Sequence, residues 1–296
     1  MTFSSESSLY PLAQTKRIFV SDLDGTLLRN NATLSDFARQ SLREMLLDGL
    51  HFTVATGRSV ISTQQILGDL PLPMPVICSN GACVSDLASG HHRFVNALEK
   101  PLDRDIFYLM REKGLNPFVS SFNGKEEHLY IDHVSNAGMD AYYQDRVATG
   151  DSRMRTSPDV ATMLSEQIIC MNAIDRVERL RDMAMEMEER YPARLQVYLY
   201  EDWYSRGWYW LSMYDRLATK AYAIEVLMRE YGYSANELTV FGDNINDLPM
   251  FHLAGKRIAP ANAIEEVLQI ADETIEANET DSVVNYLRKA TGRYVL

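Results

Sequence analysis

The chain carries, at Arg17-Ile18-Phe19-Val20-Ser21-Asp22-Leu23-Asp24-Gly25-Thr26, an apolar run that ends in two aspartates and a glycine. A short apolar run of this kind predicts a buried β-strand, and the glycine predicts a tight turn directly after it. Two carboxylates so close together cannot share a buried pocket cheaply unless a cation, a proton or both neutralise them. Although Asp-Gly alone is common in ordinary turns, the whole pattern indicates a magnesium-assisted phosphoryl-transfer centre.

The segments on either side of the middle of the chain alternate strand and helix patterns with short connections. Such alternation favours a parallel sheet covered by helices. In the first third of the chain, the predicted strands and helices span residues 17–21, 34–47, 51–55, 60–67 and 76–79. In the last third, they span residues 219–230, 238–241, 247–253, 264–270 and 282–289.

The middle of the chain has a different pattern of predicted strands and helices. It combines short strands with two helices, which suggests an α+β module whose helices lie on one face of an antiparallel sheet. The predicted pieces are a hairpin at 84–86 and 93–95, helices at 103–113 and 176–190, and strands at 116–122, 128–131, 167–172, 194–201 and 208–214.

Because the two flanking segments share the same alternation of strands and helices, we interpret the middle as an insertion. The predicted fold class is α/β, a Rossmann-like doubly wound parallel sheet core with an inserted α+β cap domain. The core comprises residues 1–83 and 214–296, the cap comprises residues 84–213, and residues 1–15 are expected to form a flexible tail.

Polar clusters follow three of the predicted core strands. Asp22 and Asp24 follow the first, Thr56-Gly57 follows the second, and Asp243-Asn244-Ile245-Asn246-Asp247 follows the strand at 238–241. Ligands of open α/β sheets bind beyond the carboxyl ends of the strands. We therefore expect these clusters to converge on one site.

Each cluster also has a purely structural interpretation. Thr56 or Ser59 can cap the following helix, and Asp243 or Asn244 can do the same farther along. Lys220 lies in the first turn of a predicted helix, where a cation opposes the helix dipole unless an anion lies nearby. Taken singly, the lysine is best explained as solvated, but all four clusters in this order are hard to explain without a common site.

Composition limits the classes of partner. The formal net charge of −12 argues against nucleic acid and anionic membranes as partners. No stretch reaches the roughly 20 apolar residues of a membrane helix, and the polar amino terminus does not resemble a secretion signal, so we expect a cytoplasmic protein. The cysteines, Cys78, Cys83 and Cys170, are expected to be reduced, half-buried thiols.

The motifs together resemble those of the haloacid dehalogenase superfamily of phosphohydrolases, in its Cof-like branch with a large cap. The resemblance implies Asp22 as the nucleophile, which forms an aspartyl-phosphate, and Asp24 as general acid and then base. Magnesium would be held by the Asp22 carboxylate, the Asp24 backbone carbonyl and Asp243, with Asn244 nearby and Asp247 supporting the metal shell. Phosphate would be bound by the residues Leu23, Thr56, Gly57, Lys220 and Asn246.

The resemblance implies a magnesium-dependent phosphomonoester hydrolase that acts on a small phosphorylated metabolite, such as a sugar phosphate, as a monomer or homodimer. One alternative is a phosphotransferase or mutase of the phosphomannomutase type, which would keep or re-donate the phosphoryl group. Another is a phospho-aspartate signalling module, which the large insertion disfavours. The divergent cap leaves the substrate open.

Overall fold

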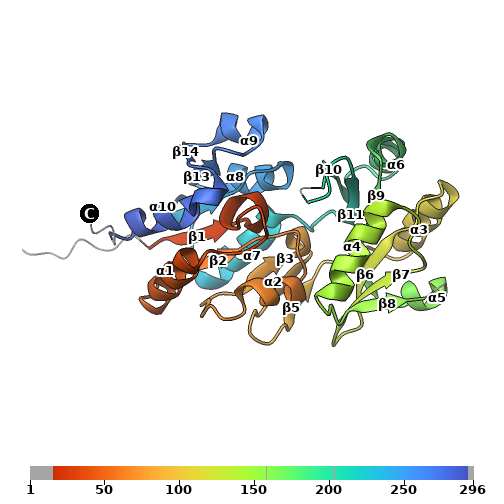
Figure 1. Cartoon of the computed structure of the whole chain (residues 1–296), viewed down its shortest axis with the longest axis horizontal. Coiled ribbons are helices and arrows are strands. Elements are labelled where there is room, and N and C mark those ends of the chain that lie inside the picture. The colour runs from red at the N-terminus through yellow and green to blue at the C-terminus, as the bar shows by residue number, and fades with distance from the viewer. Residues whose placement is uncertain (1–15, 158, 203, 293–296) are drawn as a thin grey trace, which may run out of the picture.

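The protein is described here by a computed structural model covering residues 16–157, 159–202 and 204–292, so the predicted tail 1–15 lies outside the described residues. Its core is a five-stranded sheet in the order β14-β13-β12-β1-β2, in which all pairs are parallel (Figure 1). The strands are β1 (Ile18–Ser21), β2 (Phe52–Val54), β12 (Leu238–Phe241), β13 (Lys256–Pro260) and β14 (Glu273–Ile275). This confirms the predicted parallel core.

Helices cover both faces of the core sheet, which makes it doubly wound. On one face, buried side chains of Phe19, Phe52 and Phe241 pack against α1, α2 and α10. On the other face, Ile18 and Val20 pack against α7, α8 and α9. The helices are α1 (Asp36–Leu47), α2 (Val60–Leu67), α7 (Lys220–Tyr231), α8 (Leu248–Leu253), α9 (Glu265–Ile270) and α10 (Ser282–Ala290).

The inserted cap is built on a six-stranded sheet in the order β10-β11-β9-β6-β7-β8. Its strands are β6 (Phe118–Phe122), β7 (Glu127–Ile131), β8 (Met154–Thr156), β9 (Gln167–Asp175), β10 (Leu195–Glu201) and β11 (Tyr209–Asp215). One face packs against α3 (Leu102–Glu112) and α6 (Val177–Arg190). All strand pairs are antiparallel except β7 with β8.

The two cap helices predicted from the sequence, α3 and α6, lie on one face of the sheet as expected, but the cap has helices on both faces. An additional helix, α4 (Ala137–Ala148), packs through Met139 against Phe118 and Ile174 on the opposite face. Only Gly138 and Met139 are buried in this helix, so its sequence carries little of the periodic apolar pattern that predicts a helix. The sequence analysis also missed β8 and the short α5 (Val160–Met163).

The hairpin at the start of the insertion pairs with the core side of the molecule. Strands β4 (Cys83–Ser85) and β5 (His92–Val95) form a small sheet with β3 (Val76–Cys78), and Ile77 of β3 bridges to Ala55 beside β2. Because this hairpin does not join the cap sheet, we propose that the inserted domain begins after Val95 and not at residue 84.

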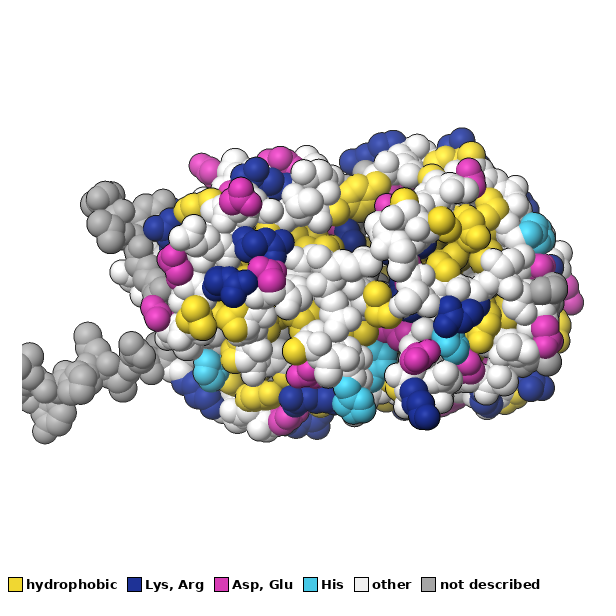
Figure 2. Space-filling model, turned by 60° about the horizontal axis from the view of Figure 1, so that its bottom comes forward, with side chains coloured by type: hydrophobic (Ala, Val, Ile, Leu, Met, Phe, Trp, Pro, Cys, Tyr) yellow, Lys and Arg dark blue, Asp and Glu magenta, His cyan; other side chains and the backbone are white. Residues whose placement is uncertain are grey.

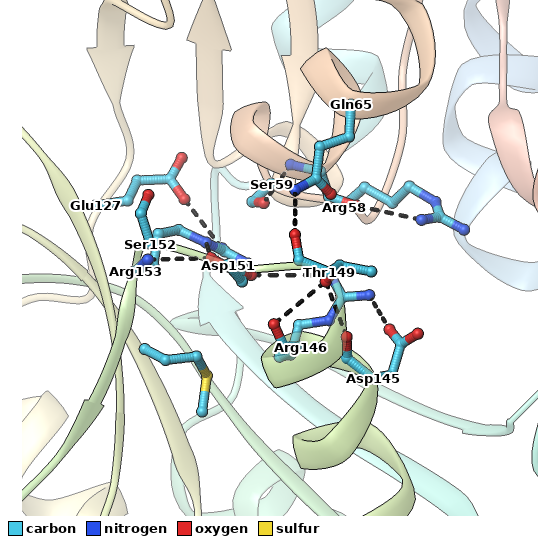
Figure 3. Close-up of polar contacts among 12 residues, drawn as sticks. Arg58, Ser59, Gln65, Glu127, Asp145, Arg146, Thr149, Asp151, Ser152 and Arg153 are labelled. Carbon is cyan, nitrogen blue, oxygen red and sulfur yellow. Dashed lines mark hydrogen bonds and ion pairs between the residues drawn. The ribbon is translucent and has the colours of Figure 1, made fainter.

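Charged groups are buried where the cap meets the core. Arg153 lies between Glu127 and Asp151, with contacts of 3.1 Å and 2.6 Å, and all three side chains are at most 5% exposed (Figure 3). Glu127 in turn lies 3.1 Å from the Nε2 atom of His92, which belongs to the core-side hairpin. Gln65 of α2 also donates a 3.3 Å hydrogen bond to the Thr149 carbonyl of the cap. The interface is therefore polar and specific.

Figure 2 shows basic and acidic side chains interspersed over one face of the molecule. Within the part of the chain that the structure describes, no helix has the length and apolar character needed to cross a membrane. The cysteines are free, and they are fully buried, deeper than the half-buried positions expected from the sequence.

Candidate active site

The register of the parallel strands brings the predicted clusters together. Ser21 at the end of β1 is level with Phe241 of β12 on one side and with Val54 of β2 on the other. The next residue, Asp22, donates its backbone N–H to the Phe241 carbonyl at 2.9 Å. Asp22, Thr56 and Asp243 therefore emerge at the same edge of the sheet, as expected for a doubly wound fold.

Gly25 shapes the turn that follows Asp22. Its φ is +77°, and a Cβ atom there would lie 2.4 Å from Asp243 Oδ2, so only glycine fits without displacement. The neighbouring Thr26 hydroxyl donates to Asp243 Oδ1 at 2.5 Å, and Asn262 Nδ2 donates to the Gly25 carbonyl at 2.8 Å. The turn is thus fitted directly around the Asp243 carboxylate.

The loop after β12 is held by its own carboxylate. Asp247 Oδ2 accepts the backbone N–H groups of Asp243 at 2.8 Å and Asn244 at 3.0 Å. Asn244 uses its side-chain oxygen to accept the Ile245 N–H at 2.8 Å, as a helix cap does. The Asn244 side chain therefore acts as a helix cap, which is the structural role that its sequence position predicted.

Lys220 lies at the centre of the acidic cluster. Thr219 is the N-cap of α7, which places Lys220 in the first turn with no exposed surface. Its Nζ atom is 2.8 Å from Asp22 Oδ1 and 2.6 Å from Asp247 Oδ1. The interpretation of Lys220 as a solvated lysine is therefore wrong, because two anions surround it and outweigh the unfavourable helix dipole.

The cluster carries more acidic than basic groups. Asp22, Asp243 and Asp247 offer carboxylate oxygens that all lie within 4.8 Å of one another, against the single ammonium of Lys220. Burial raises the pKa of Asp22 to about 7, with Lys220 opposing the shift and the Asp247 charge adding to it. Burial, followed by the Asp22 and Asp247 charges, raises the pKa of Asp243 well above its usual range. A buried oxygen cluster with surplus negative charge fits a hard divalent cation.

A second loop adjoins this cluster at the end of β2. Thr56 is fully buried, and its hydroxyl accepts the Arg58 N–H at 3.1 Å, so it caps the turn. Asn246 Nδ2 donates to Asn80 Oδ1 at 2.9 Å, and a Cβ atom on Gly57 would lie 3.3 Å from the same oxygen. Asn80 thereby links the Thr56-Gly57 turn to the Asp243 loop.

Asp24 has different partners from Asp22. Arg58 donates to both of its carboxylate oxygens, and the Tyr204 hydroxyl from the cap also donates to it. Burial alone would raise the pKa of Asp24, but the hydrogen bonds and charge of Arg58, with the hydrogen bond of Tyr204, hold the pKa below its usual range. Leu23, between the two aspartates, is fully buried.

Arg58, Asn80, Tyr204 and Thr26 contact the site without having been predicted as site residues. Arg58 and Asn80 lie within motifs that follow strands β2 and β3, so their position at the sheet edge was an available signal. Tyr204 gave no such signal, because it is one of many aromatic residues in the segment 198–214 and lies 180 residues from Asp24.

Comparisons with known proteins point to one family. The family model described as haloacid dehalogenase-like hydrolase matches residues 19–287. The chain is 24% identical to the 5-amino-6-(5-phospho-D-ribitylamino)uracil phosphatase YitU of Bacillus subtilis, covering 90% of this chain and 95% of the relative. It is also 24% identical to the pyridoxal phosphate phosphatase YbhA of Escherichia coli, covering 92% of this chain and 98% of the relative.

A solved structure shows the same fold. The haloacid dehalogenase-like hydrolase from Bacteroides thetaiotaomicron superposes with a TM-score of 0.77 at 21% identity, covering 93% of this chain and 99% of that one. The family match spans nearly all of the described chain, including the cap. The chain therefore belongs to the haloacid dehalogenase-like hydrolases and is a phosphatase of their Cof-like branch.

Proposed function

We propose that this phosphatase is a magnesium-dependent phosphomonoester hydrolase that works through an aspartyl-phosphate on Asp22. The observation that carries the proposal is the placement of Asp22, buried at the end of β1 and 2.8 Å from Lys220. Lys220 holds one carboxylate oxygen and fixes the orientation of the group. An oriented carboxylate is a suitable nucleophile for in-line attack on phosphorus.

The surplus of buried carboxylates supports the magnesium requirement. Asp22, Asp243 and the Asp24 backbone carbonyl would hold the ion, and Asp247 would support Asp243 through its backbone N–H. Asn244 would lie nearby and contribute through its backbone contact to Asp247. When bound, magnesium supplies positive charge that offsets the repulsion between the attacking carboxylate and the phosphate.

In the first step, an Asp22 oxygen bonds to phosphorus as the ester P–O bond breaks, and Asp24 gives its proton to the leaving oxygen. In the second step, Asp24 takes a proton from water, the water oxygen bonds to phosphorus, and Asp22 is released with inorganic phosphate. The two displacements use one pocket twice. Lys220, which contacts Asp22 at 2.8 Å, is a proposed phosphate ligand together with the Leu23 backbone, the Thr56-Gly57 turn and Asn246.

We propose that the substrate is a small phosphorylated metabolite, with sugar phosphates as the first class to test. The two named relatives act on chemically different phosphate esters, so family membership does not choose among substrates. Their names also favour water as the phosphoryl acceptor over a mutase reaction. If the enzyme releases inorganic phosphate from sugar 1-phosphates much faster than it converts them to 6-phosphates, the result would support hydrolysis over a mutase reaction.

The direct test is to trap the intermediate. Wild-type enzyme mixed with a ³²P-labelled ester and magnesium, then quenched in acid, should retain label on the protein, and hydroxylamine should release it. Asp22→Asn should retain no label and lose several orders of magnitude in turnover while staying folded. Asn172→Asp, a change in a half-buried cap residue outside the cluster, serves as the matched control. Labelled Asp22→Asn protein would contradict the assignment.

A further inference from the structure

Arg58 holds the carboxylate of Asp24 from the core side. Its Nε atom donates to Asp24 Oδ2 at 2.7 Å, and its Nη2 atom donates to Asp24 Oδ1 at 2.6 Å. The Arg58 side chain is only 17% exposed, so the pair is partly shielded from water. Such a two-point contact fixes the plane of the carboxylate.

Tyr204 reaches the same carboxylate from the cap. Its hydroxyl donates to Asp24 Oδ1 at 2.5 Å and lies 3.3 Å from Arg58 Nη2. The residue is 51% exposed, so its ring is not buried in either domain. Tyr204 therefore connects the cap directly to a group that the proposed reaction requires.

The position of Tyr204 is set within the cap. Asp202 Oδ1 accepts the backbone N–H groups of Tyr204 at 2.7 Å and Ser205 at 3.0 Å, and Asp202 Oδ2 accepts the Trp210 Nε1–H at 2.7 Å. These contacts tie the turn between β10 and β11 to the cap sheet. The Tyr204 hydroxyl consequently meets Asp24 only when the cap lies in the position seen here.

The three hydrogen bonds to Asp24 are distributed unequally over its two carboxylate oxygens. Oδ1 accepts from Arg58 Nη2 and from Tyr204, whereas Oδ2 accepts only from Arg58 Nε. A carboxylate has about four acceptor positions, two on each oxygen. One position therefore remains, and it is on Oδ2.

We propose that Tyr204 is a positioning residue, supplied by the cap, that together with Arg58 fixes the Asp24 carboxylate and leaves one acceptor position, on Oδ2, open. This inference rests on the proposed function, in which Asp24 is the acid and base. In that reaction, Asp24 exchanges a proton first with the leaving oxygen, as the ester P–O bond breaks, and then with the attacking water, so its carboxylate must be held in place through both steps.

The role of Tyr204 can be tested by changing its hydroxyl alone. Tyr204→Phe should lower kcat by at least about tenfold on an alkyl phosphate, whose leaving alkoxide needs the proton, because general acid catalysis contributes on the order of a hundredfold or more. On p-nitrophenyl phosphate, whose leaving group needs no proton, kcat should change by less than about threefold. KM should stay unchanged for both esters. Tyr209→Phe, a half-buried cap tyrosine on β11, is the matched control and should behave as wild type.

A second variant tests whether the cap sets the position. Asp202→Ala keeps the tyrosine itself but removes the acceptor that ties its turn to the sheet, so the hydroxyl should lose its fixed position and the variant should show the same dependence on the leaving group. An equal loss on both esters would overturn the proposal, because it would indicate a structural effect. A lower KM with unchanged kcat would also overturn it, since the hydroxyl would then merely compete with substrate.

Failure of this inference can be separated from failure of the proposed function. Label trapping on Asp22 reports the nucleophile and does not depend on the Tyr204 hydroxyl. Normal labelling together with a Tyr204→Phe enzyme that matches wild type on both esters would overturn the role of Tyr204 alone. Absence of label in the wild-type enzyme would count against the aspartyl-phosphate, whatever the Tyr204 variant does.

Discussion

The Nζ atom of Lys220 lies 2.6 Å from Asp247 Oδ1, and neither side chain is exposed to solvent. A lysine this deeply buried would ordinarily favour its neutral form. Here burial alone would lower the pKa of Lys220, but the charges of Asp22 and Asp247 raise it above its usual range. The ammonium is therefore charged at neutral pH and balances part of the acidic cluster.

Removal of this ammonium should destabilise the fold as well as stop the reaction. Lys220→Met leaves Asp22 and Asp247 buried without their cation, and breaking such a buried pair costs about 3–5 kcal/mol. Urea denaturation of the metal-free protein measures the loss. Lys256→Met, which removes an exposed partner of Glu273, should cost less than about 1 kcal/mol. Equal losses in the two variants would show that Lys220 is not the counter-ion described here.

Substitutions at two glycines can distinguish the effect of backbone strain from the effect of displacing Asp243. Gly25 and Gly49 have φ values of +77° and +88°, but a Cβ atom would strike Asp243 only at Gly25, whereas nothing lies within 4 Å at Gly49. Alanine at either position should cost about 1–2 kcal/mol in unfolding free energy. Only Gly25→Ala should also lose activity, by more than about tenfold, as measured by phosphate release. If Gly49→Ala lost activity to the same extent, strain and not displacement of Asp243 would be the cause.

The magnesium requirement should depend on Asp243. Asp243→Asn removes a charge from the buried cluster, so the magnesium concentration for half-maximal activity should rise at least about tenfold. Chelation should abolish activity, and calcium should restore it poorly because its coordination is larger and looser. Asp69→Asn, at an exposed ion pair with Arg39 and Arg43, provides the control. Full activity after exhaustive chelation would contradict the mechanism.

Acid should weaken the contact between the cap and the core through Glu127. Burial alone would raise the pKa of Glu127, but the hydrogen bond with His92 and the charge of Arg153 lower the pKa below its usual value. A group with a lowered folded-state pKa stabilises the fold above its unfolded pKa of about 4.3 and loses that contribution as the pH falls through the folded value. Wild type should therefore lose more stability than Glu127→Gln between about pH 6 and pH 3.

Urea denaturation midpoints across that range provide the measurement for Glu127. Glu126→Gln, a neighbouring residue whose side chain is 72% exposed, should follow the wild-type curve. If the curve of Glu127→Gln also ran parallel to wild type, the buried carboxylate would contribute nothing to acid sensitivity. Because Glu127 lies in the cap and His92 in the core-side hairpin, the result also reports on contact between the domains.

The core could be predicted from sequence because its signals are local. The apolar run before Asp22 and the capping residue Thr219 each determine a nearby element, and parallel register then brings the strand ends together. Contacts across the two domains carry no such signal. The pairing of Tyr204 with Asp24 depends on where the whole cap comes to rest, which no short pattern in the sequence describes.

The cap was harder to predict because the apolar patterns of some of its elements are weak. Helix α4 follows a long stretch of strand-like sequence and has few buried side chains, so hydrophobic periodicity could not reveal it. The hairpin of β4 and β5 was predicted, but it was assigned to the cap domain. Its place on the core side follows from the pairing of β4 with β3, and a short stretch of sequence does not specify the partner of a strand. Motif positions were thus available from sequence, whereas long-range partners were not.

The two chain crossings between the domains lie against each other. Asn96 Nδ2 is 3.4 Å from the Gly81 carbonyl and 3.4 Å from the Leu217 carbonyl, and a Cβ atom on Gly81 would lie 2.1 Å from the Thr219 carbonyl. Since the ends of the insertion meet, a linker of a few residues from Asn96 to Leu217 would close the core at a low cost in loop entropy. An insertion whose two ends meet can change in length or sequence without pulling the core strands apart, whereas a grafted cap would need its own partners for His92 and Asp24.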